Sequence, residues 1–133
     1  MSTNIIQLSP HFTVKEFKCH DGTDVPVVLL PYAQKLAEQL EIIRSVDDYW
    51  ISILSAYRTD KYNKKVGGRK NSFHLMCMAA DIVKPHIRVT ELFQQILHLI
   101  QHEVIIDGGL GIYDTFIHYD IRSTPARWDE RTT

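Results

Sequence analysis

The sequence predicts an α+β domain in which helices flank a small antiparallel sheet. Two stretches carry apolar residues at helical spacing, and short segments rich in β-branched and aromatic residues separate and follow them. The order helix, strand, helix, strand, with a strand-rich C-terminal part, is typical of helices packed on an antiparallel sheet. A length of 133 residues fits one hydrophobic core, so we expect residues 1–133 to form a single domain.

The first half of the chain contains one long helix and one strand. Residues 1–31 show no regular period, and we expect them to be irregular with a turn at residues 20–23. Pro31 begins a helix whose apolar face continues to about Ser45, because proline is favoured at the first helical position. Residues 50–55 have the composition of a strand, and residues 62–66 predict a short helix.

The second half repeats the alternation and ends in strands. Residues 79–83 predict a strand, and Thr90 can cap a helix whose apolar positions continue to Ile100. Two β segments are then expected, at residues 104–107 and 111–121, with a turn near residues 114 and 115 in the second.

Composition excludes several classes of protein. Lys and Arg number 15 against 16 Asp and Glu, so a net charge of −1 gives no general attraction to nucleic acid. No apolar run approaches the roughly 20 residues of a membrane span, and we see no secretory signal at the N-terminus. Cys19 and Cys77 are too few for a disulfide framework, so we expect reduced thiols, with one bridge as the alternative. We expect a monomer.

Positive charge is concentrated between residues 58 and 70. This segment holds six cationic residues, which are Arg58, Lys61, Lys64, Lys65, Arg69 and Lys70. Such a cluster is typical of a solvated surface, and the alternative is a contact with an anionic polymer such as teichoic acid. Few aromatic residues lie among these charges, which argues against nucleic-acid binding.

Three side chains are candidates for a metal site. Asp81 and His118 each lie on a predicted strand, and neighbouring strands can present both to one point, because side chains alternate between faces. His74, in the turn before the first of these strands, can reach the same point. Two imidazoles and a carboxylate form a three-ligand zinc set with an open fourth position. The alternative is a surface His74 and a hydrogen-bonded core His118.

These residues stand in a motif that resembles the M15 group of zinc peptidases. That group includes D-alanyl-D-alanine carboxypeptidases and endolysin-type peptidases, and it shares its fold with the hedgehog signalling domain. Its pattern S-x-H-x-x-G-x-A-x-D is matched by Ser72, His74, Ala79 and Asp81, and its later H-x-D by residues 118–120.

The resemblance covers nearly the whole chain in the right order. Residues 12–19 resemble the F-T-x-x-E-F-x-C start of the smaller members, and residues 55–58 resemble their S-G-Y-R. Residues 63–68 resemble N-x-x-V-G-G, and Trp128 resembles part of the closing segment.

The resemblance implies a role for each matched residue. His74, Asp81 and His118 would be the zinc ligands. Arg58 would polarise the scissile carbonyl or stabilise the developing oxyanion, and the alternative for Arg58 is a surface ion pair with Asp60. Ser72 would bind substrate or support His74.

Two positions depart from the family pattern. Cys77 replaces a glycine, so the turn there could differ, and we expect its side chain to be small and buried rather than a metal ligand. Thr115 replaces the Glu that acts as general base in the dipeptidase branch. Asp120, Asp114 and Asp107 are therefore alternative proton carriers. Asp120 could instead orient a ligand imidazole, and we prefer that role slightly.

The resemblance implies a zinc peptidase that cleaves peptide bonds of bacterial peptidoglycan by means of a zinc-activated water. Its site of action would be the bacterial cell wall, and the sequence itself identifies no compartment. The alternative is a catalytically inactive, zinc-containing binding module of the same fold, which the absence of the Glu favours.

Overall fold

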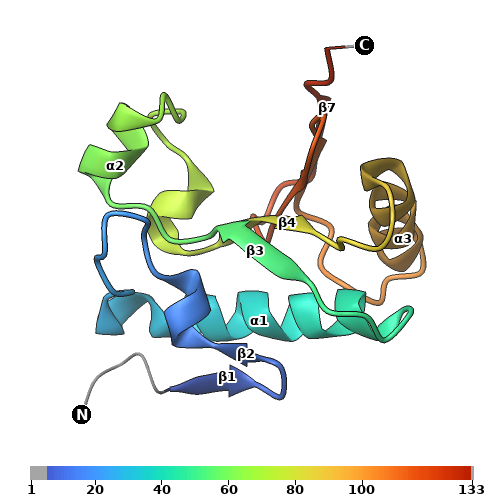
Figure 1. Cartoon of the computed structure of the whole chain (residues 1–133), viewed down its shortest axis with the longest axis horizontal. Helices are drawn as coiled ribbons and strands as arrows, with labels where there is room; N and C mark the ends of the chain where they lie inside the picture. The colour runs from blue at the N-terminus through green and yellow to red at the C-terminus, as the bar shows by residue number, and fades with distance from the viewer. Residues whose placement is uncertain (1–5, 133) are drawn as a thin grey trace.

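A five-stranded sheet forms the centre of the computed structural model, which describes residues 6–132 (Figure 1). The strand order is β3-β4-β6-β5-β7, with bounds β3 Ser52–Ser55, β4 Ala79–Val83, β5 Gly109–Ile112, β6 Ile117–Asp120 and β7 Ala126–Asp129. Neighbouring strands are antiparallel except β5 and β7, which pair in parallel. The predicted α+β class is confirmed, and the parallel edge strand is an addition to it.

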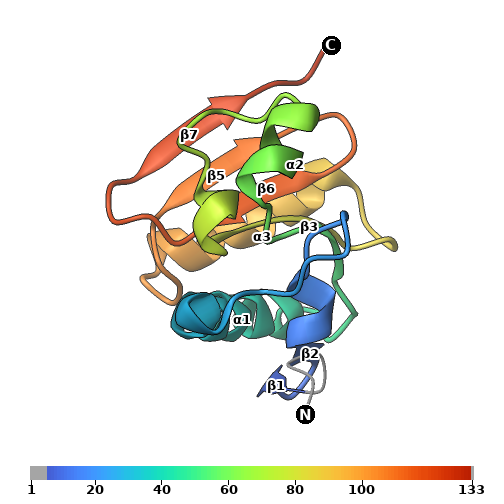
Figure 2. The same cartoon turned by 90° about the vertical axis from the view of Figure 1, so that its left-hand side faces the viewer.

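The helices pack around this sheet through the apolar faces that the sequence predicts. Helix α1 (Leu30–Ser45) buries Ala33, Leu36, Ala37, Leu40 and Ile43. Helix α3 (Val89–Gln101) buries Leu92, Ile96 and Ile100. The short α2 (Asp60–Lys65) is capped by Thr59, whose hydroxyl accepts a hydrogen bond from the Tyr62 amide. Figure 2 shows α2 and α3 on opposite sides of the sheet, with α1 beneath it.

The N-terminal segment is more ordered than the sequence predicts. Strands β1 (Gln7–Ser9) and β2 (Phe12–Thr13) form a small antiparallel sheet, which packs on α1. Two 3-10 helices follow, η2 (Val14–Phe17) and η3 (Val27–Leu29). Residues 1–5 of the expected irregular segment lie outside the described residues. The expectation of irregular structure was wrong for residues 7–9, 12–17 and 27–29, because elements this short leave almost no periodic pattern. Residues 18–26 are irregular as expected, with the expected turn at residues 20–22.

The strand predicted at residues 104–107 is absent, and the strand in this region is β5, which begins at Gly109. Glu103 adopts a left-handed φ of 58°, and the Val104 amide donates to the Leu99 carbonyl at 2.9 Å. These are the contacts of a Schellman motif, so Val104 belongs to the end of α3. The predicted turn near residues 114 and 115 is present between β5 and β6.

The register of β4 and β6 determines where the polar side chains meet. Asp81 lies directly opposite His118, and Ala79 lies opposite Asp120. Because side chains alternate along a strand, Asp81 and His118 project from the same face of the sheet. Among residues 6–132, no helix is long and apolar enough to cross a membrane. Cys19 and Cys77 are both buried free thiols.

A buried lysine joins β4 to the end of α1 and to α3. The ammonium group of Lys84, which follows β4, donates to the Ile43 carbonyl at 2.7 Å, to Asp47 at 2.9 Å and to Gln95 at 2.8 Å. Burial lowers the Lys84 pKa, and the hydrogen bond and charge of Asp47 oppose that shift. The lysine therefore connects the end of α1 with β4 and α3.

We expect Lys84→Met to lower the free energy of unfolding by about 3 kcal/mol, because it removes a buried ammonium group that donates to the Ile43 carbonyl, Asp47 and Gln95 at once. Denaturant titration measures this change. The matched control is Lys35→Met on the exposed face of α1, which should change stability by less than about 0.5 kcal/mol. Equal effects of the two substitutions would contradict the connecting role of Lys84.

Candidate metal centre

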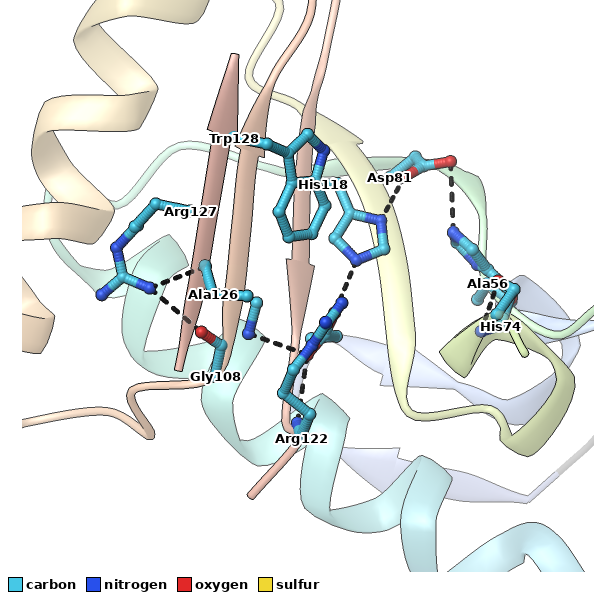
Figure 3. Close-up of polar contacts among 12 residues, drawn as sticks. Ala56, His74, Asp81, Gly108, His118, Arg122, Ala126, Arg127 and Trp128 are labelled. Atoms are coloured by element: carbon cyan, nitrogen blue, oxygen red, sulfur yellow. Dashed lines mark hydrogen bonds and ion pairs between the residues drawn. The ribbon is translucent and has the colours of Figure 1, made fainter. Parts of the chain in front are cut away.

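Three buried side chains converge at one face of the sheet (Figure 3). Asp81 comes from β4, His118 from β6, and His74 from the 3-10 helix η4 (Phe73–Met76) that precedes β4. Each offers a ligand atom, and these atoms lie within 4.8 Å of one another. The structure thus brings together the three residues that strand alternation and motif spacing single out, and we call His74, Asp81 and His118 the triad.

His74 is held with one ring nitrogen toward Asp81. Its Nδ1 donates to the Ala56 carbonyl at 2.6 Å, and its Nε2 lies 3.4 Å from an Asp81 oxygen. The Ser72 hydroxyl accepts a hydrogen bond from the His74 amide, with an N···O distance of 3.2 Å, and so caps η4. Because Nδ1 donates to a backbone carbonyl, Nε2 is the nitrogen of His74 that is placed to bind a ligand. Ser72 thus contacts the His74 backbone, and it also lines the adjoining cleft.

Cys77 ends η4 in the left-handed conformation, with φ of 57°, a conformation that favours the glycine of the family pattern. Its side chain is fully buried, and burial raises the pKa of the thiol to about 12. Cys77 is thus a neutral, small apolar side chain beside the triad.

His118 lies between two carboxylates. Its Nδ1 is 3.1 Å from Asp81 Oδ1, and its Nε2 is 2.7 Å from Asp120 Oδ2. Burial by itself lowers the His118 pKa, but the hydrogen bonds to Asp120 and Asp81 outweigh it and raise the pKa. His118 Nδ1 is therefore the nitrogen that faces Asp81, and Nε2 faces Asp120 on the other side of the ring.

Asp81 is kept ionised despite its burial. Burial raises the Asp81 pKa, but hydrogen bonds from His118 and His74 outweigh that effect and hold the pKa well below its usual range. Arg58 Nη2 adds a positive charge 3.3 Å from Asp81 Oδ2. A charged carboxylate and two imidazoles thus meet in one buried site.

Arg58 is fixed beside the triad and does not pair with Asp60, which instead pairs with Lys64 at 3.1 Å. Arg58 Nε donates to the Ser55 hydroxyl, and Nη1 donates to Asn63 Oδ1, both at 3.2 Å. Asn63 is buried and donates in turn to the Arg69 carbonyl. Sequence analysis identifies Asn63 only as part of a motif, because its contacts with Arg58 and with the Arg69 carbonyl form only in the folded chain.

A cleft of about 980 Å³ opens over the triad. Its walls include an aromatic group made of Phe73, Tyr113, Phe116 and Trp128. The indole of Trp128 lies over Gly111 of β5, where an added Cβ would come within 2.2 Å of the indole nitrogen. From the basic segment, Arg58, Arg69 and Lys70 line the cleft.

The three aspartates considered as proton carriers lie away from the cleft lining. Asp120 is completely buried behind His118, Asp107 forms an ion pair with Arg127, and Asp114 accepts hydrogen bonds from Thr132. Apart from Asp81, the carboxylate that lines the cleft within the described residues is Glu130. Sequence reasoning missed Glu130, although it follows Trp128 by two residues and so projects from the same face of the extended chain.

The donor set fits a divalent transition metal. Two imidazole nitrogens and one carboxylate oxygen converge, and the remaining nitrogen of each imidazole contacts the Ala56 carbonyl or Asp120. Such contacts behind ligand imidazoles are usual in metal sites, where they set the tautomer and the ring orientation.

Comparison with known proteins agrees with this geometry. A model of the Peptidase M15 family matches residues 10–120, a range that includes Arg58 and the three triad residues. The members of this family are metallopeptidases. No curated protein shows a significant match to the chain.

We expect the triad to bind one divalent metal ion. Zn²⁺ at 100 times its Kd should stabilise the metal-free protein by about 2.7 kcal/mol, because only the folded chain holds the three donors together. Thermal unfolding with and without Zn²⁺ measures this gain. His74→Ala should abolish the gain, whereas His98→Ala on the exposed side of α3 should retain it. A gain that survives in His74→Ala would show that the metal binds elsewhere.

Proposed function

The chain belongs to the Peptidase M15 family, and we propose that it is a zinc peptidase that cleaves peptide bonds of bacterial peptidoglycan. The bonds would be those of stem peptides or cross-links that involve D-amino acids, so the site of action would be the cell wall. The observation that carries the proposal is a buried His-Asp-His triad at the base of an open cleft, with Arg58 beside it.

His74, Asp81 and His118 would hold the zinc ion through Nε2, a carboxylate oxygen and Nδ1 respectively. When bound, zinc supplies a Lewis acid and lowers the pKa of a coordinated water, so that hydrolysis proceeds near neutral pH. The residues behind the triad hold the donor atoms in place before the metal arrives.

Arg58 would bind the oxygen of the scissile carbonyl and stabilise its negative charge in the transition state. Ser55 and Asn63 each accept one of its N–H groups, so the guanidinium is oriented before the substrate enters. A fixed, permanently charged donor in a partly dry site is effective because it needs no reorganisation during the reaction.

Glu130 would carry the proton from the attacking water to the leaving amine. It lines the cleft on the same edge as Trp128, whose ring lies 5.0 Å from the His118 ring. Asp120 has a different role in this proposal. Its carboxylate is buried and accepts from His118 Nε2, so it orients that ligand.

The lining of the cleft supports a peptide substrate with free carboxylates. Arg69 and Lys70 are exposed at its margin, and the aromatic group offers an apolar wall for side chains. Peptidoglycan stem peptides carry such carboxylates. Recognition of the D-configuration is implied by the family resemblance alone.

The second candidate is a zinc-containing binding module without catalytic activity. The absence of an acidic residue three positions before His118, where Thr115 stands, favours it. The binding module predicts stoichiometric zinc with no release of peptide from any peptidoglycan chemotype. The peptidase predicts release that depends on both zinc and Arg58.

We expect Arg58→Lys to lower kcat on peptidoglycan peptides by about 100-fold or more, because the planar pair of donors at the oxyanion is lost. Peptide release with zinc content measured in the same samples tests this. Arg127→Lys, in the same cleft but paired with Asp107, should retain most of the activity. Equal activity of the two variants would remove Arg58 from the mechanism.

We expect Glu130→Gln to lower kcat by about 100-fold or more while zinc binding is unchanged, because the amide cannot accept a proton. The measurement is the kcat of zinc-loaded protein near neutral pH. Asp114→Asn is the matched control, since Asp114 lies on the preceding β5–β6 turn and outside the cleft lining. Full activity of Glu130→Gln together with a loss of kcat in Asp114→Asn would contradict the role of Glu130 and assign the proton transfer to Asp114.

A further inference from the structure

Arg122 binds the Asp120 carboxylate, behind the triad, through two guanidinium donors. It follows β6 by two residues, and its Nε donates to Asp120 Oδ1 at 2.9 Å while Nη2 donates to Oδ2 at 2.6 Å. The Arg122 amide adds a third hydrogen bond to Oδ1 at 3.1 Å. A planar guanidinium that binds both carboxylate oxygens fixes the direction of the carboxylate as well as its charge.

Two aromatic rings hold the guanidinium from different elements. The central carbon of the Arg122 guanidinium lies 4.4 Å from the centre of the Phe73 ring and 5.2 Å from that of Trp128. Phe73 belongs to η4, next to His74, and Trp128 belongs to β7. Cation–π contacts of this kind restrict the arginine to one position, so it does not swing freely into the cleft.

Strand β5 leaves room for this ion pair. A Cβ on Gly109 would lie 2.2 Å from Asp120 Oδ2 and 2.7 Å from Arg122 Nε. The Gly109 amide also donates to Asp120 Oδ1 at 2.8 Å. The chain thus has a glycine where any side chain would displace the pair.

His118 Nε2 is the remaining group that reaches this carboxylate, at 2.7 Å from Asp120 Oδ2. Figure 3 shows Asp81 and Arg122 on opposite sides of the His118 ring. The Asp120 carboxylate, bound by Arg122 through both oxygens, accepts a hydrogen bond from His118 Nε2. Nδ1 lies on the other side of the ring, 3.1 Å from Asp81 Oδ1, so it is the nitrogen that would bind a metal ion at the triad in place of a proton.

We propose that Arg122 is a positioning residue for the metal centre, which acts through Asp120 to hold His118 with Nδ1 toward the triad. This inference rests on the proposed zinc peptidase, and it adds a residue that touches neither metal nor reacting atoms. Arg122 also joins η4 to β7, so the two walls of the cleft and the ligand His118 share one support.

The experiment compares Arg122→Gln and Arg122→Lys with Arg127→Gln, a control that changes another arginine of the cleft. Proteins labelled with 15N-histidine, with and without Zn²⁺, report which His118 nitrogen carries hydrogen, and His118→Gln assigns the signal. Competition with a chelator gives the Kd for Zn²⁺.

The wild type should show a protonated Nε2 in both states, and a metal-bound Nδ1 with Zn²⁺. Arg122→Gln should weaken the Nε2–H signal and raise the Kd for Zn²⁺ by about 10–100-fold. Arg122→Lys should recover part of that loss, and Arg127→Gln should match the wild type.

An unchanged His118 signal and Kd in Arg122→Gln would overturn the inference. A wild-type protein that lacks the Nε2 proton would also overturn it, even if neither Arg122 variant folds. These readouts do not depend on hydrolysis, so an inactive wild type would remove the proposed function without affecting this result.

Discussion

The site depends on one imidazole held between two carboxylates. Asp81 and Asp120 flank His118 at its two ring nitrogens, and each carboxylate has its own arginine, Arg58 or Arg122. Burying two negative charges this close together is costly without such partners. The register of the sheet brings these partners together. Strands β4 and β6 place Asp81 opposite His118, and β5 has a glycine where the Asp120–Arg122 ion pair lies.

The arrangement explains how a chain with almost no net charge supports a charged site. Within the net charge of −1, the ion pairs Arg58–Asp81 and Asp120–Arg122 lie on either side of His118. Each member is oriented by a neighbour of opposite charge or by a backbone group. The geometry of the donors is therefore set by the protein before any metal or substrate binds, which is what a catalytic site requires.

The sequence predicted the parts of this structure that local pattern determines. The apolar faces of α1 and α3 follow the helical period, and Asp81 and His118 meet because alternation and motif spacing agree. Pattern could not predict features set by tertiary contact. Gly109 falls between the two β segments predicted at residues 104–107 and 111–121, yet it lies in β5, where Asp120 and Arg122 occupy the space that a side chain would fill. Glu130 reaches the cleft only through the parallel pairing of β7, which no local signal indicates.

The central claim is that the protein holds zinc through His74, Asp81 and His118, with His118 turned by Asp120. A crystal structure of the zinc-loaded protein, with anomalous scattering recorded at the zinc edge, tests this most directly. The account predicts one strong peak bonded to His74 Nε2, an Asp81 oxygen and His118 Nδ1, with Asp120 still bound to Arg122. A peak bonded to His118 Nε2 or to Asp120, or no peak at the triad, would contradict it.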